Sequence, residues 1–313
     1  MEFATFDLQG FEKSGLSKRN ALAAQLDKIC RDSGFLVLTG HGVSENCITD
    51  MQNAVQEFFK QAPDDKQKVK APYAGYPYGY LGPNSEALAK SKGVDTPPDL
   101  KESFNGGPQD VPHGIVDPEA LEFCYVPTIW PDLDGFKPAW QTYYGEMERL
   151  ASRIMVAFAV ALNLPDGFFE DYINHPISGL RALNYPATDE ISLLNQQRAG
   201  AHTDYGSLTI LLPQAESQGL QVALPDGGWF DVPTPEGAFV INIGDLMARW
   251  TVDRWVSTLH RVVAKPHQPA RQSLAFFHQP NWDSVIAPLD GSKKYENVLS
   301  GPYLMEKFKS TGS

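Results

Sequence analysis

The sequence predicts a mixed fold that is mainly β, with helices before residue 176 and sheets stacked as a sandwich or barrel after it. Two observations indicate this arrangement. From Leu180 onward, short apolar and β-branched runs alternate with Gly, Pro and Asp, which is typical of strands joined by turns. Before that point, apolar residues recur at helical spacing in long segments.

The expected elements follow from these patterns in order. Helical spacing predicts helices over residues 17–32, 44–61 and about 139–164. Ser44 is a suitable N-cap for the second helix, and Pro165 is expected to end the third. FLVLTG, from Phe35 to Gly40, is expected to be a short strand. Pro, Gly and Tyr crowd YAGYPYGYLGPN, residues 73–84, and exclude a regular helix there.

Composition limits the class of protein. The chain has 313 residues, of which 42% are hydrophobic and 20% charged, as in ordinary soluble globular proteins. This length allows either two domains or one enlarged β domain. The formal net charge of -12 argues against a nucleic-acid partner, because neutralising phosphates requires a basic surface.

The three cysteines and the N-terminal segment bear on the compartment. Cys30, Cys47 and Cys124 are odd in number and lack metal-type spacing, which disfavours a disulfide framework and favours a reducing compartment. MEFATFDLQGFEKSG has no basic start followed by an apolar region, and no run approaches about 18 apolar residues. We therefore expect a cytoplasmic protein that does not span a membrane.

Two histidines and an aspartate form a candidate metal site. His202 and Asp204 stand two apart in HTDYGSLTILL, which we expect to be a strand, so both side chains would face one side. His260 lies in VSTLHRVVAK, which we expect to be another strand that meets the first pair only if the sheet folds over. Two imidazoles and one carboxylate can occupy one face of an octahedral metal, an arrangement that suits non-heme Fe(II) and oxygen chemistry.

A candidate carboxylate site follows in the sequence. Arg271 and Ser273 begin RQSLAFF, a third expected strand, and share one face of it. They offer a bidentate cation and a hydroxyl to a carboxylate. An H-x-D or R-x-S pattern alone often arises by chance, but here they occur together, in this order, with no nearby Cys to indicate a zinc site. The combination predicts an oxygenase that holds one metal ion and one dicarboxylate.

The chain resembles the Fe(II)- and 2-oxoglutarate-dependent dioxygenases of the isopenicillin N synthase-like type over nearly its whole length. The segments that carry the resemblance are SGFLVLTGHGV (Ser33 to Val43), HTDYGSLTILL, GLQV (Gly219 to Val222), INIGDLMARW, STLHRVV and RQSLAFF. The resemblance implies a double-stranded β-helix, which is a distorted jelly roll, with an N-terminal helical region packed on it. It also implies four ranges: an N-terminal dioxygenase region (1–120), a connecting segment with the long helix (121–175), the jelly-roll core (176–285) and a C-terminal segment (286–313).

The same resemblance assigns residues to roles. His202, Asp204 and His260 would ligate iron, and Arg271 and Ser273 would hold the far carboxylate of 2-oxoglutarate. Tyr185, in Asn184-Tyr185-Pro186, would hydrogen-bond this co-substrate, although Leu183 stands where some plant members carry a further asparagine. Candidate substrate contacts are Tyr80, Phe104, Arg198, Leu211, Leu220, Ala275 and Phe277.

The implied reaction is hydroxylation or desaturation of a small organic metabolite with release of succinate and CO2. We expect molecular oxygen and a small molecule as partners, and no nucleic acid, membrane or obligate protein partner. Two other interpretations stay open on the sequence. An isopenicillin N synthase-like Fe(II) oxidase needs no 2-oxoglutarate and uses the R-x-S pair for its substrate carboxylate. A jelly-roll binding module would keep the residues without catalysis.

Overall fold

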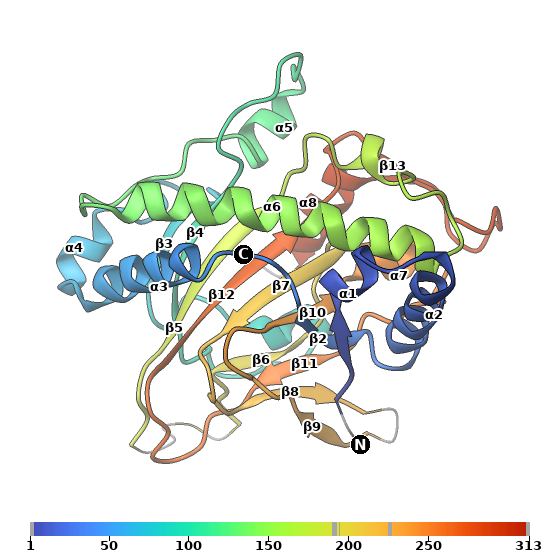
Figure 1. The fold of residues 1–313 in the computed structure, drawn as a ribbon. Helices are drawn as coiled ribbons and strands as arrows, with labels where there is room; N and C mark the ends of the chain where they lie inside the picture. The colour runs from blue at the N-terminus through green and yellow to red at the C-terminus, as the bar shows by residue number, and fades with distance from the viewer. Residues whose placement is uncertain (1–2, 190–192, 194, 225–226, 311–313) are drawn as a thin grey trace.

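The computed structural model describes residues 3–189, 193, 195–224 and 227–310 (Figure 1). The α-helices are α1 (Leu8–Glu12), α2 (Leu16–Asp32), α3 (Glu45–Lys60), α4 (Pro63–Gln67), α5 (Pro118–Phe123), α6 (Phe136–Ala161), α7 (Asp245–Trp250) and α8 (Ser300–Ser310). Two 3-10 turns, η1 (Leu88–Lys92) and η2 (Glu170–Tyr172), connect other elements. No helix in the described ranges is long and apolar enough to cross a membrane.

The strands form two main sheets and one small pair. They are β1 (Thr5–Asp7), β2 (Phe35–Thr39), β3 (Gly79–Leu81), β4 (Glu102–Gly106), β5 (Gly179–Tyr185), β6 (Ala199–His202), β7 (Leu208–Pro213), β8 (Leu220–Ala223), β9 (Trp229–Asp231), β10 (Phe239–Ile243), β11 (His260–Val262), β12 (Arg271–His278), β13 (Val285–Ile286) and β14 (Val298–Leu299). The large sheet has the order β1-β2-β10-β7-β12-β5-β4-β3, and the small sheet has the order β6-β11-β8-β9. Strands β13 and β14 pair separately.

The large sheet has two faces with different partners, because successive side chains of a strand point to opposite sides. On the outer face, Ala182, Leu274 and Phe276 belong to the main core, which includes the buried stripe of α6. Figure 1 shows α6 lying across this face. On the inner face, Leu183 and Ala275 belong to a second apolar cluster shared with strands of the small sheet. This layering confirms the predicted jelly-roll core with a helical region packed on it.

Sequence from both sides of residue 176 builds the large sheet. Strands β1 and β2 form one edge, where β2 pairs with β10, and β3 and β4 form the other edge, where β4 pairs with β5. The N-terminal region therefore extends the core sheet at both ends besides covering it with helices. The division into four ranges stays a prediction.

The predicted helices are confirmed with small differences at their ends. Ser44 stands at the N-cap of α3, but its side chain makes no capping hydrogen bond. Helix α6 begins earlier than predicted, since Pro138 fits in a first turn, where its missing N–H has no helical partner. Helix α6 also ends before it reaches Pro165. Asn163 takes a left-handed φ of 59°, and Leu164 N donates to Ala159 O at 2.9 Å, which closes the helix there.

Candidate active site

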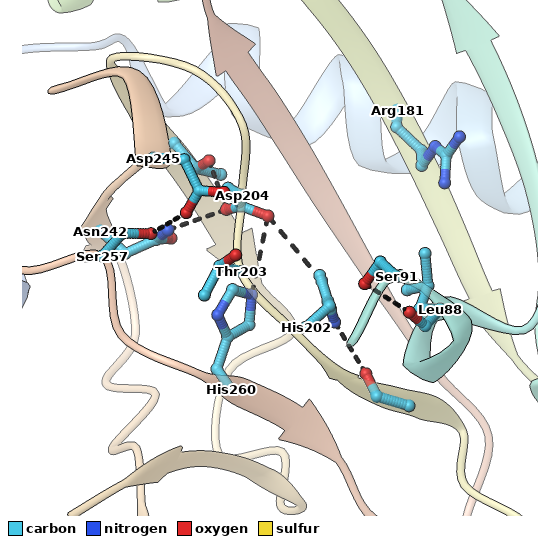
Figure 2. Close-up of polar contacts among 12 residues, drawn as sticks. Leu88, Ser91, Arg181, His202, Thr203, Asp204, Asn242, Asp245, Ser257 and His260 are labelled. Atoms are coloured by element: carbon cyan, nitrogen blue, oxygen red, sulfur yellow. Dashed lines mark hydrogen bonds and ion pairs between the residues drawn. The ribbon is translucent and has the colours of Figure 1, made fainter. Parts of the chain in front are cut away.

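Two strands of the small sheet bring His202 and His260 together. His202 ends β6, His260 begins β11, and the two residues are direct partners in the antiparallel register. Their ring centroids are 4.4 Å apart, and both rings point into the same space in Figure 2. The prediction that different strands supply the two histidines is confirmed.

The prediction that Asp204 shares a strand with His202 is wrong. β6 ends at His202, and Asp204 lies in the loop that leaves the small sheet and enters β7 of the large sheet. The loop nevertheless directs Asp204 toward the histidines, with Oδ1 3.8 Å from His202 Nε2 and 3.7 Å from His260 Nε2. The ligand atoms of the three residues all lie within 4.8 Å of one another, which fits a single metal ion.

Backbone carbonyls orient both imidazoles. His202 Nδ1 lies 2.7 Å from Gly200 O, and His260 Nδ1 lies 3.2 Å from Thr258 O. A carbonyl oxygen only accepts hydrogen bonds, so each Nδ1 carries a proton, and in the neutral imidazole Nε2 is then the nitrogen with the lone pair. This is the usual support for histidine as a metal ligand.

Neighbouring polar groups also fix the carboxylate of Asp204. Thr209 Oγ1 and Asn242 Nδ2 donate to its Oδ2 at 2.5 and 2.8 Å, and this leaves Oδ1 to face the histidines. The backbone N–H of Asp245 donates to Asp204 O at 2.7 Å and holds the loop itself. Thr209, Asn242 and Asp245 come from β7, β10 and the start of α7, so three further elements position one ligand.

The charge states of the cluster suit a cation. Burial lowers the pKa of His202, and the adjacent His260 lowers it further, which favours the neutral imidazole that binds metal. Burial raises the pKa of Asp204, but the histidines and the hydrogen bonds from Thr209 and Asn242 outweigh it and lower that pKa overall. Two imidazoles and one carboxylate are a donor set that fits Fe(II).

A buried arginine marks a second part of the site. Arg271 begins β12, is 5% exposed and pairs in register with Tyr185 of β5. Its guanidinium lies 4.6 Å from the centre of the Tyr185 ring, and Nη1 donates to Ser217 Oγ at 3.1 Å. Its Nε is buried, and no described residue forms a hydrogen bond with it. Ser273, which faces the same way two residues on, is also buried. A buried cation that makes no ion pair within the described residues suits a carboxylate ligand.

Four of the candidate substrate contacts lie in or against the inner apolar cluster. Leu220 and Ala275 are buried in the inner cluster, and Leu211 and Phe277 pack against it. These four residues therefore lie between the sheets, and their contact with a substrate remains a proposal.

Tyr80 and Phe104 do not lie at the site, so their prediction as substrate contacts is corrected. Both belong to the core under the helices, on the outer face of the large sheet. Phe104 packs against Trp140 of α6 with ring centroids 5.1 Å apart, and Tyr80 donates to Glu102. Their positions in β3 and β4 put them on this face because Phe104 pairs with Ala182, another outer residue.

Arg198 is buried among backbone carbonyls. It is 1% exposed, and its Nη2 donates to the carbonyls of Pro186 and Pro269 at 2.8 and 2.7 Å. These backbone groups lie close in sequence to Tyr185 and Arg271. Arg198 therefore lies in the region of Arg271, and its contact with a substrate remains a proposal.

Sequence reasoning missed several residues that shape the site. Thr209 and Asn242 could have been noticed in the sequence because each is a polar residue within an apolar strand segment. Phe35 of β2, whose ring centroid is 5.3 Å from that of His260, gave no signal beyond its place in a strand. The turn η1 packs beside β6, where Lys92 Nζ donates to Thr203 Oγ1 at 2.6 Å.

Comparison with known proteins gives two family matches along the chain. Residues 4–133 match the N-terminal model described as non-haem dioxygenase in morphine synthesis, and residues 177–280 match the 2OG-Fe(II) oxygenase superfamily. The second match contains the histidine and aspartate cluster, Arg271 and Ser273.

Named relatives agree with these matches. Validamycin A dioxygenase of Streptomyces hygroscopicus subsp. limoneus is 32% identical over 291 residues, covering 90% of this chain and 78% of the relative. A homoarginine-6-hydroxylase of Arabidopsis thaliana is 32% identical over 304 residues, covering 91% and 88%. A full-length Neurospora crassa protein solved in complex with alpha-KG has a TM-score of 0.87 at 29% identity, covering 99% of this chain and 96% of that one.

These relatives favour the oxygenase over the 2-oxoglutarate-independent oxidase and over a binding module without catalysis. The cofactors are Fe(II) and 2-oxoglutarate, which the donor set of the cluster and the buried cation fit. The chain belongs to the 2OG-Fe(II) oxygenase superfamily and is a 2-oxoglutarate-dependent dioxygenase.

Proposed function

We propose that His202, Asp204 and His260 hold the iron of this dioxygenase, that Arg271 and Ser273 hold the far carboxylate of 2-oxoglutarate, and that Tyr185 hydrogen-bonds this co-substrate. The observation that carries the first assignment is the convergence of the three ligand atoms within 4.8 Å. The second rests on the buried Arg271, which faces an inner surface without an ion-pair partner in the described ranges. With molecular oxygen as the oxidant, bound Fe(II) and 2-oxoglutarate would allow oxidation of an unactivated C–H bond, while 2-oxoglutarate is oxidised to succinate and CO2.

The residues of the chain then provide position and a dry environment. The carbonyl contacts of His202 and His260 keep their Nε2 lone pairs directed at one point. The inner apolar cluster, with Leu211, Leu220 and Phe277, excludes water from the space between the sheets. Tyr185 supports the guanidinium of Arg271 by stacking, so the cation is fixed before a carboxylate arrives.

We further propose that the substrate is a small organic metabolite bound on the side of His202 that faces η1 and Arg181. Figure 2 shows Leu88, Ser91 and Arg181 on this side. Arg181 is held by Asn105 Oδ1 at 2.7 Å and by both oxygens of Glu86 at 3.1 and 3.2 Å, so polar groups line one wall. The names of relatives support a small acceptor, since they act on validamycin A and homoarginine, and the Neurospora protein was also solved with thymine.

The proposal includes action in the cytoplasm without an obligate protein partner or nucleic acid. Free Cys30, Cys47 and Cys124 and the net charge of -12 support this environment. Isolation of the mature chain from a secreted fraction with one of these cysteines in a disulfide would oppose it.

The proposed function is tested with a panel of small metabolites, including amino acids, sugars and nucleobases. Each is incubated with the protein, Fe(II), 2-oxoglutarate and oxygen, while succinate and the product are measured by mass spectrometry. We expect one metabolite to give product and succinate in equal amounts. Full-rate oxygen consumption with the true substrate, without 2-oxoglutarate and without succinate, would instead support the oxidase.

A further inference from the structure

Arg198 lies inside the protein, and its positive charge has no ion-pair partner among the described residues. It directly precedes β6 and is 1% exposed. Its Nη2 donates to three backbone carbonyls, those of Pro186 at 2.8 Å, Gln268 at 3.4 Å and Pro269 at 2.7 Å. Its Nε is buried and has no hydrogen-bond partner in the part of the chain that the structure describes. The carbonyls satisfy hydrogen bonds but carry no net charge, so the guanidinium keeps an uncompensated charge within the described residues.

The three carbonyls belong to the two strand ends that carry the proposed co-substrate residues. Pro186 directly follows Tyr185, which ends β5, and Pro269 lies two residues before Arg271, which begins β12. Tyr185 and Arg271 are register partners, and Figure 1 shows β5 and β12 side by side to these ends. Nη2 of Arg198 therefore connects the ends of β5 and β12 through hydrogen bonds that are not part of the pairing between these strands.

A second contact ties the same segments. Thr188 N donates to Gln268 O at 3.0 Å, and Thr188 Oγ1 donates to Lys265 O at 2.8 Å. Arg198 and Thr188 thus both connect the segments that flank the Tyr185 and Arg271 pair. Fixed strand ends matter here because the distance between an arginine and its aromatic support sets where the guanidinium points.

Two buried guanidinium groups also act on each other. Burial lowers the pKa of Arg198, and the neighbouring charge of Arg271 lowers it further. Burial lowers the pKa of Arg271 as well, yet an arginine stays protonated at neutral pH. Neither Nε has a hydrogen-bond partner among the described residues, and the two guanidinium groups present positive charge that a dianionic ligand would neutralise.

We infer that Arg198 is a positioning residue of the co-substrate site, where it holds Tyr185 and Arg271 at their separation and adds a second positive charge. The chemical consequence of this positioning is that the protein binds a 2-oxo acid with a distal carboxylate in preference to one that ends in a methyl group. The inference rests on the proposed function, in which Arg271 binds that carboxylate.

Binding to the Fe(II)-loaded protein without oxygen tests the inference by isothermal titration. The two probes are 2-oxoglutarate and 2-oxopentanoate, which has a methyl group where 2-oxoglutarate has its distal carboxylate. Arg198→Gln should weaken 2-oxoglutarate binding about tenfold or more and change 2-oxopentanoate binding by less than about threefold. Arg198→Lys, which keeps the charge and loses the planar fork, should recover part of the loss. Arg149→Gln, on an exposed side chain paired with Glu146, is the control and should change neither affinity.

The outcomes separate this inference from the proposed function. An unchanged 2-oxoglutarate affinity in Arg198→Gln, or an equal loss for both probes, would overturn the role of Arg198. If Arg271→Gln also binds 2-oxoglutarate like the parent, the proposed co-substrate site itself fails. If Arg198→Gln does not fold, Arg198→Lys decides, because loss of selectivity in a folded lysine variant supports the inference and parent-like binding of both probes contradicts it.

Discussion

Thr209 and Asn242 donate to the same oxygen of Asp204, Oδ2, from neighbouring strands β7 and β10. Thr209 and Asn242 are themselves register partners, so the sheet fixes the two donors relative to each other. The loop that carries Asp204 therefore needs no regular structure, since the large sheet defines where its carboxylate points. The remaining oxygen, Oδ1, faces both histidines.

This relationship predicts the effect of Thr209→Val. The variant keeps the shape of the side chain but removes one donor, so Asp204 becomes freer to rotate. We expect Fe(II) affinity to fall by roughly 10-fold to 100-fold, the usual cost of losing a hydrogen bond that orients a metal ligand. Anaerobic Fe(II) titration measures it, with Ser152→Ala on the exposed side of α6 as control. Unchanged affinity in Thr209→Val would show that the hydrogen bond does not orient the ligand.

Arg271 and Ser273 are predicted to differ in their effect on 2-oxoglutarate. Removing one partner of a buried, hydrogen-bonded charge pair costs about 2–5 kcal/mol, which at ~1.4 kcal/mol per decade is roughly thirty-fold or more in affinity. Arg271→Gln should show this loss. Ser273→Ala should cost about 0.5–1.5 kcal/mol, and somewhat more if the hydroxyl donates to a charged acceptor. The order of the two losses in a titration is the test, and a larger loss in Ser273→Ala would reverse the assignment.

A substitution of Phe104 tests whether this side chain packs in the core under the helices and does not contact the substrate. Phe104→Leu leaves a gap among Phe58, Phe136 and Trp140, so it should lower the free energy of unfolding. It should leave 2-oxoglutarate and substrate KM values unchanged at a temperature where the variant is folded. Chemical denaturation and steady-state kinetics check both halves. A raised substrate KM with unchanged stability would restore Phe104 as a substrate contact.

His278 is predicted to make the protein less stable in mild acid. Burial lowers its folded-state pKa to about 4, below the value of about 6.5 in the unfolded chain. A lowered folded-state pKa gives stability that is present above pH 6.5 and is lost as the pH falls through 4. His278→Gln removes this titration and should flatten the acid loss by up to about 3 kcal/mol. Urea unfolding of both proteins at pH 7.5, 5.5 and 4.5 measures the difference, and parallel pH profiles would rule the prediction out.

Much of the fold followed from the sequence because local patterns determine it. The apolar periodicity of α2, α3 and α6 and the turn residues after Leu180 are local signals, and the structure agrees with them. The end of α6 was misjudged because Asn163, in a left-handed conformation, stops the helix before Pro165 does.

The proposed metal and co-substrate residues could be named from the sequence because the H-x-D, His and R-x-S patterns occur together in this order, whereas the residues that support them could not. Asp204 leaves the strand because the chain changes sheets there, and the donor Asn242 comes from a strand distant in sequence. Tyr80 and Phe104 were misplaced because the face of a short edge strand depends on its register with β5. The contacts of Arg198 could not be predicted because only the folded chain shows which backbone carbonyls surround it.

The most direct test of the account is anaerobic Fe(II) titration of the parent protein and His260→Ala, read out by bound iron per chain. His113→Ala, a change at an exposed histidine outside the cluster, is the matched control. We predict one Fe(II) per chain in the parent and in His113→Ala, and a large loss of affinity in His260→Ala with the fold retained by circular dichroism. Parent-like iron affinity in His260→Ala would contradict the assignment of His202, Asp204 and His260 as the metal site.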